Sequence, residues 1–290
     1  MNLSELIKNK NSKDQARIES LRADRENLSE MRNAALTEVT SNPEMYQRYL
    51  DLQSGNISLS AGNVALTMIQ LQVATKIGPT DYWHEQGRYV LDDAIKNGAK
   101  VFVTPKNSQR RGYLMGDYYD ISQTSGKPMK EQVPLAENSP RMLKALESLM
   151  NYSPVPIVED NEMAAPAYYD PEKLELSVNA HYSDLEVFAA LSTEVTYARI
   201  HGKGRNMDFT REEYRLDAES VGYMLCRRFG VEQSAPHAAA VRQLYDGYEP
   251  ADRSDALERL RKTAQNIGDG IERTIQPRQQ EQSRKRYAAR

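Results

Sequence analysis

Cysteine is almost absent from the sequence: Cys226 is the only one among 290 residues. A single thiol cannot form a disulfide within the chain, which excludes a fold held together by disulfides. The surrounding residues, GYMLCRRFG, are typical of the apolar side of a helix, where cysteine behaves as a small hydrophobic side chain. We therefore interpret Cys226 as a core residue.

Long hydrophobic runs are missing as well. No stretch approaches the roughly 18 uninterrupted apolar residues that a membrane-spanning helix needs. The first residues, MNLSELIKNKNSKDQARIES, contain no apolar core of a secretory signal peptide. The sequence therefore predicts a cytoplasmic protein without a membrane partner.

The chain also lacks a strong excess of one charge. It has 38 Lys and Arg against 41 Asp and Glu, a formal net charge of −3. Total charge does not decide whether nucleic acid is a partner, because a phosphate-binding surface is a local patch. The distribution of charge along the chain is therefore more informative.

One segment is poor in apolar residues and rich in proline. It reads GKPMKEQVPLAENSP, residues 126–140, and has the composition of a linker. We therefore expect two domains with extensions at both ends: a charged helical arm at 1–42, an N-terminal domain at 43–125, a C-terminal domain at 141–275 and a basic, disordered tail at 276–290.

The periodicity of the N-terminal domain predicts helices packed on a small antiparallel sheet. Apolar residues at helical spacing indicate a helix at 43–55 and a largely buried one within 58–78. Two strand-like runs, KVFVTP and GYLMGDYYDIS, flank the basic turn KNSQRR and predict a β-hairpin.

The C-terminal domain is expected to be helical with one short hairpin. The segment APAYYDPEKLELSV predicts two strands around a turn at 170–173. Two long helices follow, one at 183–201 with Ser183 as its N-cap and one at 210–230. The fold class is therefore α+β and rich in helices.

The first of these helices, within LSTEVTYARIHG, raises a question of chemistry. Glu194 stands where the helix of a zinc peptidase reads His-Glu-x-x-His, but Thr193 and Tyr197 occupy the two histidine positions. A threonine hydroxyl is a poor zinc donor, and a tyrosine is protonated at neutral pH. We therefore expect no zinc and no catalytic residue here, although a different ligand set stays open as an alternative.

The second helix adds another carboxylate. Glu219 lies among Leu216, Val221 and Met224, near the apolar face of EEYRLDAESVGYMLCRRFGV. A carboxylate close to a core usually has a partner, because an unpaired buried charge is costly. Tyr197 is one candidate partner: its hydroxyl would bind Glu219 and fill the volume of a lost metal.

The Tyr-Asp-Pro hairpin, the helix with ALSTEVTYARIHG and the helix with YRLDAESVGYMLCRRFGV together resemble the zincin-like metallopeptidase domain of ArdC-like and LtrC-like proteins. Plasmids, phages and integrative conjugative elements encode those proteins. The resemblance places Glu194 at the general-base position and Glu219 at the third metal-ligand position. Thr193 and Tyr197 replace the two histidines, which implies a peptidase domain that has lost its zinc ligands.

The N-terminal domain resembles the same family. The segments LSAGNVALTMIQLQ, DYWHEQGRYV, NGAKVFVTP and YYDISQTSG match the ArdC-type N-terminal domain. The matching positions are Asn63, Trp83, Gly98, Lys100, Asp120, Ser122, Gln123 and Thr124. Both resemblances together cover about residues 45 to 245.

The resemblance implies a protein that binds single-stranded DNA and protects the entering DNA of a mobile element from host restriction. Such binding needs cations for phosphate and aromatic faces for bases. The candidate DNA-binding residues combine both kinds of side chain: Tyr82, Trp83, Tyr89, Lys100, Lys106, Arg110, Arg111 and Tyr113. Two alternatives remain, a metallopeptidase with unusual ligands, for which zinc would be the cofactor, and a protein that inhibits a host restriction or CRISPR nuclease. The sequence leaves the oligomeric state open.

Overall fold

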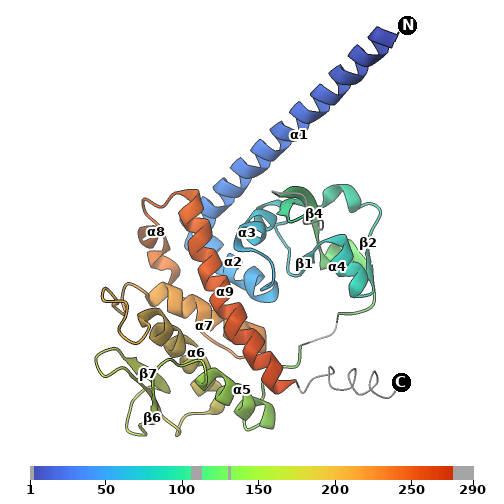
Figure 1. Cartoon of the computed structure of the whole chain (residues 1–290). Coiled ribbons are helices and arrows are strands. Elements are labelled where there is room, and N and C mark those ends of the chain that lie inside the picture. The colour runs from blue at the N-terminus through green and yellow to red at the C-terminus, as the bar shows by residue number, and fades with distance from the viewer. Residues whose placement is uncertain (1–2, 106–112, 130–131, 277–290) are drawn as a thin grey trace, which may run out of the picture.

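The computed structural model describes residues 3–105, 113–129 and 132–276 (Figure 1). Over these residues the protein is rich in helices and carries three small sheets, which confirms the predicted α+β class. The long C-terminal helix crosses the body between its two halves. No helix in the described ranges is long and apolar enough to span a membrane.

The chain begins with a long helix, α1 (Leu3–Val39), that projects from the body as an arm (Figure 1). The charged sequence of its first part forms no buried face, and the burial begins only at Leu28. From there Ala35, Leu36 and Val39 enter the core. The predicted charged helix is therefore present, and only its last third packs on the protein.

The N-terminal half contains two helices before its sheet, α2 (Pro43–Gly55) and α3 (Ala61–Gln70). Asn42 caps α2 by accepting hydrogen bonds from two backbone N–H groups, and Pro43 occupies the first turn. A three-stranded sheet follows, ordered β1 (Ile77–Gly78), β4 (Leu114–Asp120), β3 (Ala99–Val103), with both pairings antiparallel. The β3–β4 pair is the hairpin expected from the sequence.

Short elements complete this half. Helix α4 (Thr80–Glu85) follows β1, and a two-stranded sheet joins β2 (Arg88–Val90) to β5 (Thr124–Gly126). Two 3-10 turns, η1 (Ile95–Asn97) and η2 (Ile121–Gln123), connect the strands.

Two side chains of α3 close the free edge of the sheet at β3. The amide of Asn63 donates to the carbonyl of Phe102 and accepts from its N–H, at 2.7 and 3.3 Å. The amide of Gln70 makes the same pair of bonds with Lys100, at 2.9 and 2.8 Å. The seven-residue spacing matches two turns of helix, and alternate residues of a strand point their backbone groups to one side. The backbone N–H and carbonyl groups of Lys100 and Phe102 at this edge therefore find their hydrogen-bond partners on a helix instead of another strand.

A second motif of the sequence, YYDISQT, forms a corner after β4. The carboxylate of Asp120 accepts hydrogen bonds from the N–H groups of Thr75, Lys76 and Ser122. Gln123 completes a capping box with Asp120. The motif therefore has a structural role in joining the loop before β1 to the end of β4.

The C-terminal half opens with α5 (Pro140–Met150) and a sheet ordered β6 (Ile157–Glu159), β8 (Glu175–Val178), β7 (Ala167–Asp170). Strands β7 and β8 form the predicted antiparallel hairpin, and β6 runs parallel to β8. Helix α6 (Asp184–His201) begins at Ser183 with a capping box and ends at Gly202, whose φ of 62° is left-handed.

The second long helix, α7 (Arg215–Phe229), begins later than the predicted residue 210. Residues 211–214 form turns, and Arg211 reaches back to Glu194 of α6. Two short pieces follow, η3 (Ala238–Ala240) and α8 (Val241–Leu244), and α9 (Pro250–Ile275) closes the fold. Cys226 is fully buried in α7, and burial raises the pKa of its thiol to about 12, as expected for a core residue.

Both halves contribute to one hydrophobic core. Polar contacts join them too: the hydroxyl groups of Tyr46 and Ser220 are 2.8 Å apart, and the Tyr223 hydroxyl donates to Asp51 at 2.7 Å. Glu258 of α9 accepts a hydrogen bond from the N–H of Ala61 at the start of α3. The division into two domains stays a prediction, but the halves pack on each other closely.

Candidate functional site

Glu194 lies on the buried side of α6 and is held by a bidentate ion pair with Arg211. The two guanidinium nitrogens lie 2.7 and 2.8 Å from the two carboxylate oxygens. The N–H of Tyr169 in β7 donates a third hydrogen bond at 2.7 Å. Both oxygens of this carboxylate are therefore already engaged within the protein.

Arg211 comes from the loop between α6 and α7 and is enclosed by two aromatic rings. Its guanidinium carbon lies 4.1 Å from the ring centre of Tyr197 and 4.6 Å from that of Tyr168. Contacts of this kind stabilise a cation most when water is excluded. The same group donates to the carbonyl of Tyr169 at 3.0 Å, so the loop is fastened to both α6 and β7.

Tyr197 occupies the second histidine position of a zinc peptidase helix. Burial raises the pKa of its hydroxyl to about 12, although the positive charge of Arg211 acts in the opposite direction. The phenol is therefore neutral at physiological pH and is not the phenolate that a metal ion would require.

Glu219 has partners other than the predicted one. It pairs with Arg215 at 2.8 Å, one turn earlier on α7, and accepts from the N–H of His237 at 2.8 Å. No hydrogen bond between Tyr197 and Glu219 occurs in the described part of the chain, so that prediction is wrong. Arg215 is therefore the cation that pairs with Glu219, whereas the guanidinium of Arg211 supplies both charge and a fork of donors to Glu194.

Thr193 fills the first histidine position and packs between the two helices. Its hydroxyl accepts a hydrogen bond from Gln233 at 3.2 Å. A Cβ placed on Gly222 of α7 would lie 2.3 Å from that hydroxyl, so the helices are closer here than a larger residue would permit. The position is therefore part of the α6–α7 packing.

The donor set around Glu194 does not fit a zinc ion. It consists of a threonine hydroxyl, a neutral phenol and two carboxylates that are each paired with an arginine, whereas zinc prefers imidazole, thiolate and free carboxylate. Within the described ranges no group of three or more His, Cys, Asp or Glu could hold a metal. We derive no metal chemistry from this site.

An open cleft of about 990 Å³ lies beside these residues, between the start of α6, α7 and the segment after α7. Thr193, Glu194 and Glu219 line it. Two of its carboxylates are already paired: Glu194 with Arg211 and Glu219 with Arg215.

The candidate DNA-binding residues fall into three groups in the structure. Trp83 is 0% exposed, and its indole N–H donates to the carbonyls of Gly78 and Tyr119 at 3.0 and 3.1 Å. Its ring is thus a core element between α4 and the sheet, with no face available for a base, and we correct its assignment. Tyr82 packs edge-on against it at 5.0 Å and is partly buried.

The second group is exposed. Tyr89 on β2 is 60% exposed and lies near His84, while Tyr113 at the start of β4 is 58% exposed. Lys100 is also exposed but pairs with Asp117 on the neighbouring strand at 2.6 Å, which offsets its charge. The third group, Lys106, Arg110 and Arg111, lies outside the described residues.

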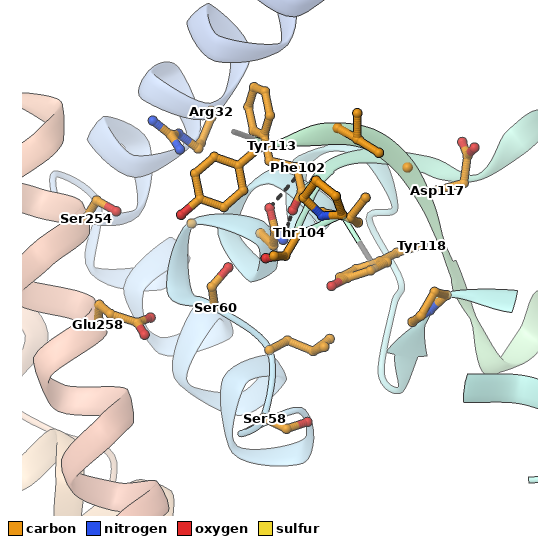
Figure 2. Close-up of a pocket in the computed structure, with 18 of the residues that line it drawn as sticks. Arg32, Ser58, Ser60, Phe102, Thr104, Tyr113, Asp117, Tyr118, Ser254 and Glu258 are labelled. Carbon is orange, nitrogen blue, oxygen red and sulfur yellow. Dashed lines mark hydrogen bonds between the residues drawn. The ribbon is translucent and has the colours of Figure 1, made fainter. Parts of the chain in front are cut away.

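A second cavity, of about 900 Å³, opens next to this hairpin (Figure 2). Phe102 of β3 and Tyr113 line it together with Arg32 of α1 and Glu258 of α9. Sequence reasoning missed Arg32 and Phe102. Nothing local distinguishes Arg32 from the other charges of the arm, and only the tertiary packing of α1 against the hairpin brings it here.

The fold and these two regions define a helix-rich α+β protein with an aromatic hairpin in one half and, in the other, a helix pair whose Glu194 and Glu219 are each paired with an arginine. No family model and no curated protein matches the chain. The solved structures that resemble it include two of the antirestriction protein ArdC from plasmid R388. The metal-free one has 18% identity, covers 74% of this chain and 84% of its own, with a TM-score of 0.44. The Mn(II)-bound one has 20% identity, covers 75% and 85%, with a TM-score of 0.46.

Structural neighbours of this chain are thus ArdC proteins, as the motifs predicted. At this level of identity and TM-score, the function has to be argued from the residues of this chain.

Proposed function

We propose that the protein binds single-stranded DNA through its N-terminal half and acts as an antirestriction-type accessory factor of a mobile genetic element. The observation that carries the proposal is the β3–β4 hairpin. In the sequence, Lys106, Arg110 and Arg111 stand between its two strands, and Tyr113, whose side chain is exposed, follows them. Cations that track phosphates beside an aromatic face are the combination that single-strand binding uses.

The same hairpin is well placed to serve as a rigid support. Asn63 and Gln70 hold β3 against α3, and the cross-strand pairs from Ala99 to Val103 hold β4. An interface held by fixed strands orders few groups on binding and so loses little conformational entropy. Tyr89 lies on a different small sheet, β2–β5, and would extend the surface.

The C-terminal half is proposed to be non-catalytic. A general base must accept a proton from water, but the carboxylate of Glu194 already accepts three hydrogen bonds and is paired with a cation. The charge of Arg211 also disfavours a metal ion at the same place. We propose that this half stabilises the chain or binds a partner through its cleft.

A second candidate, a factor that contacts a host nuclease or another protein, is favoured by the projecting arm. Large apolar residues on the free part of α1 are exposed, among them Leu6, Ile7, Ile18 and Leu21. Exposed apolar residues on a helix without a packing partner are a common feature of protein-binding surfaces.

Fluorescence anisotropy with labelled single-stranded and duplex oligonucleotides across a salt series tests the first proposal. We expect tighter binding to the single strand and a steep loss of affinity with salt. Elemental analysis of the same preparation measures zinc. Absence of DNA binding with one zinc per chain would overturn the proposal and return Glu194 to a catalytic role.

A further inference from the structure

The cavity beside the hairpin is built from parts of the chain that are far apart in sequence. Its walls come from α1, the start of α3, the β3–β4 hairpin and α9, and its volume of about 900 Å³ is in the range of small-molecule sites (Figure 2). Both the arm and the C-terminal helix are needed to form it, so it does not belong to the hairpin alone.

One end of the cavity is aromatic. Figure 2 shows Arg32, Tyr113 and Phe102 grouped together there. The guanidinium carbon of Arg32 lies 5.3 Å from the ring centre of Phe102. The Nε of Arg32 is buried and has no hydrogen-bond partner among the described residues. A buried donor without a partner is costly, so this atom favours a ligand that brings an acceptor.

The rest of the lining accepts hydrogen bonds and carries negative charge. Hydroxyl groups of Ser58, Ser60, Thr104 and Ser254 line it. The charged lining residues are Asp81, Asp117, Asp255 and Glu258 against Arg32 and Lys262. Asp117 is paired with Lys100 and Glu258 with Arg261, so Asp255 is the carboxylate whose charge disfavours a phosphate beside it.

The two carboxylates that α9 contributes to the cavity, Asp255 and Glu258, differ in whether they already have partners. Glu258 is engaged by Arg261 at 2.7 Å and by the N–H of Ala61 at 3.0 Å. Asp255 is exposed and forms no ion pair within the described ranges. It is therefore the carboxylate that can accept a hydrogen bond from a ligand.

We propose that this cavity receives one unstacked nucleobase of the bound single strand, specifically a base with an exocyclic amino group. The ring stacks at the Tyr113 and Phe102 end, the amino group donates to Asp255 or the neighbouring hydroxyls, and a ring nitrogen or carbonyl accepts from Arg32. The phosphates stay outside the cavity. The inference rests on the proposed function and adds a base-selective subsite to it.

Thymine is disfavoured by this lining because it has a carbonyl where cytosine has an amino group. The two pyrimidines are close in size, so their comparison isolates the effect of hydrogen bonding. We expect a dC oligomer to bind more tightly than a dT oligomer of equal length, and Asp255→Asn to reduce that preference.

The experiment uses the full chain with oligonucleotides that contain one 2-aminopurine, whose fluorescence is quenched or restored as its stacking changes. Anisotropy measures total affinity, and the 2-aminopurine signal reports the cavity. We expect Tyr113→Ala to weaken single-strand binding by about five-fold or more and to abolish the fluorescence change. Tyr248→Ala is the matched control, because Tyr248 is exposed to a similar extent to Tyr113 and does not line the cavity.

The outcomes separate the subsite from the proposed function. Single-strand binding that is unaffected by Tyr113→Ala and Asp255→Asn, with equal affinity for dC and dT, would overturn the subsite and leave the DNA-binding proposal intact. No single-strand binding by the wild-type chain would overturn both. Because Tyr113 and Asp255 are exposed, both variants are expected to fold, which circular dichroism checks.

Discussion

Arg211 and Glu194 form a two-armed ion pair that fastens the loop before α7 to the buried side of α6, with nitrogen–oxygen distances of 2.7 and 2.8 Å. The pair places a permanent cation beside the one carboxylate that a peptidase of this arrangement would use as its base. Tyr168 and Tyr197 enclose the guanidinium from the sides. The carboxylate of Glu194 is thus neutralised by a cation of the protein itself, in a largely buried salt bridge.

Removal of Arg211 should destabilise the fold. Arg211→Ala leaves Glu194 buried without its cation, and we expect the free energy of unfolding to fall by about 3–5 kcal/mol, measured by urea denaturation. Arg205→Ala, an exposed arginine of the same loop, is the control and should change stability by about 0.5 kcal/mol or less. Equal stability of the two variants would show that the pair contributes nothing net.

Zinc binding should require the removal of Arg211 as well as new ligands. We expect Thr193→His with Tyr197→His and Arg211→Ala to bind about one zinc per chain, measured by elemental analysis after dialysis, with Glu219 as a further ligand. The variant that keeps Arg211 should bind much less, because two cations would then share one carboxylate. Failure of the triple variant would contradict a lost metal site at this position.

Asn63 should stabilise the fold through its hydrogen bonds to the backbone of β3. Asn63→Ala removes both partners of the N–H and carbonyl of Phe102, and we expect a loss of about 1–3 kcal/mol in the free energy of unfolding. Freed edge groups also favour pairing with other chains, so the variant should aggregate more on heating. Gln72→Ala changes an exposed amide just beyond α3 and serves as the control in thermal unfolding with light scattering.

The basic loop should set the salt dependence of DNA binding. We expect Arg110→Ala with Arg111→Ala to weaken single-strand binding and to reduce the slope of log K against log salt by about 0.7 for each phosphate that the variant no longer neutralises. Anisotropy at several salt concentrations gives the slope. Arg205→Ala, far along the chain in the C-terminal half, should leave it unchanged. An unchanged slope in the loop variant would remove this loop from the interface.

Asp217 should make stability depend on mildly acidic pH. Burial raises its pKa from 3.8 to about 6, with Arg259 acting in the opposite direction. The folded chain therefore binds this proton more tightly than the unfolded chain, so its contribution to stability is full below about pH 4 and is lost as the pH rises through 6. We expect Asp217→Asn to gain stability relative to wild type between pH 4 and pH 7.

Urea denaturation at a series of pH values measures this difference. Asp246→Asn, which removes one exposed negative charge elsewhere, is the control for a general change in charge. A difference between Asp217→Asn and wild type that does not vary with pH would contradict a raised pKa at Asp217.

Local sequence was sufficient for most elements. Helix α2 begins after its N-cap Asn42, with Pro43 as its first residue. Helix α6 begins after Ser183, which forms a capping box with Glu186. Both starts could be predicted from the sequence because a cap acts within one turn of helix. Two strand-like segments on either side of a polar turn likewise predicted both hairpins, β3–β4 and β7–β8. The start of α7 was predicted too early, because Arg211 and its neighbours have helical propensity that the ion pair to Glu194 overrides.

The sequence by itself determined that this protein has helical arms and small sheets, that Thr193 and Tyr197 cannot hold zinc as histidines would, and that basic and aromatic residues lie together around one hairpin. Tertiary structure alone decided which partner neutralises Glu194, that Trp83 belongs to the core, and that Arg32 meets Phe102 and Tyr113 at one cavity. The physical reason is distance along the sequence. Helix caps, turns and the alternation of polar and apolar residues act over a few neighbouring residues, whereas burial and charge pairing depend on distant segments that meet only in the folded chain.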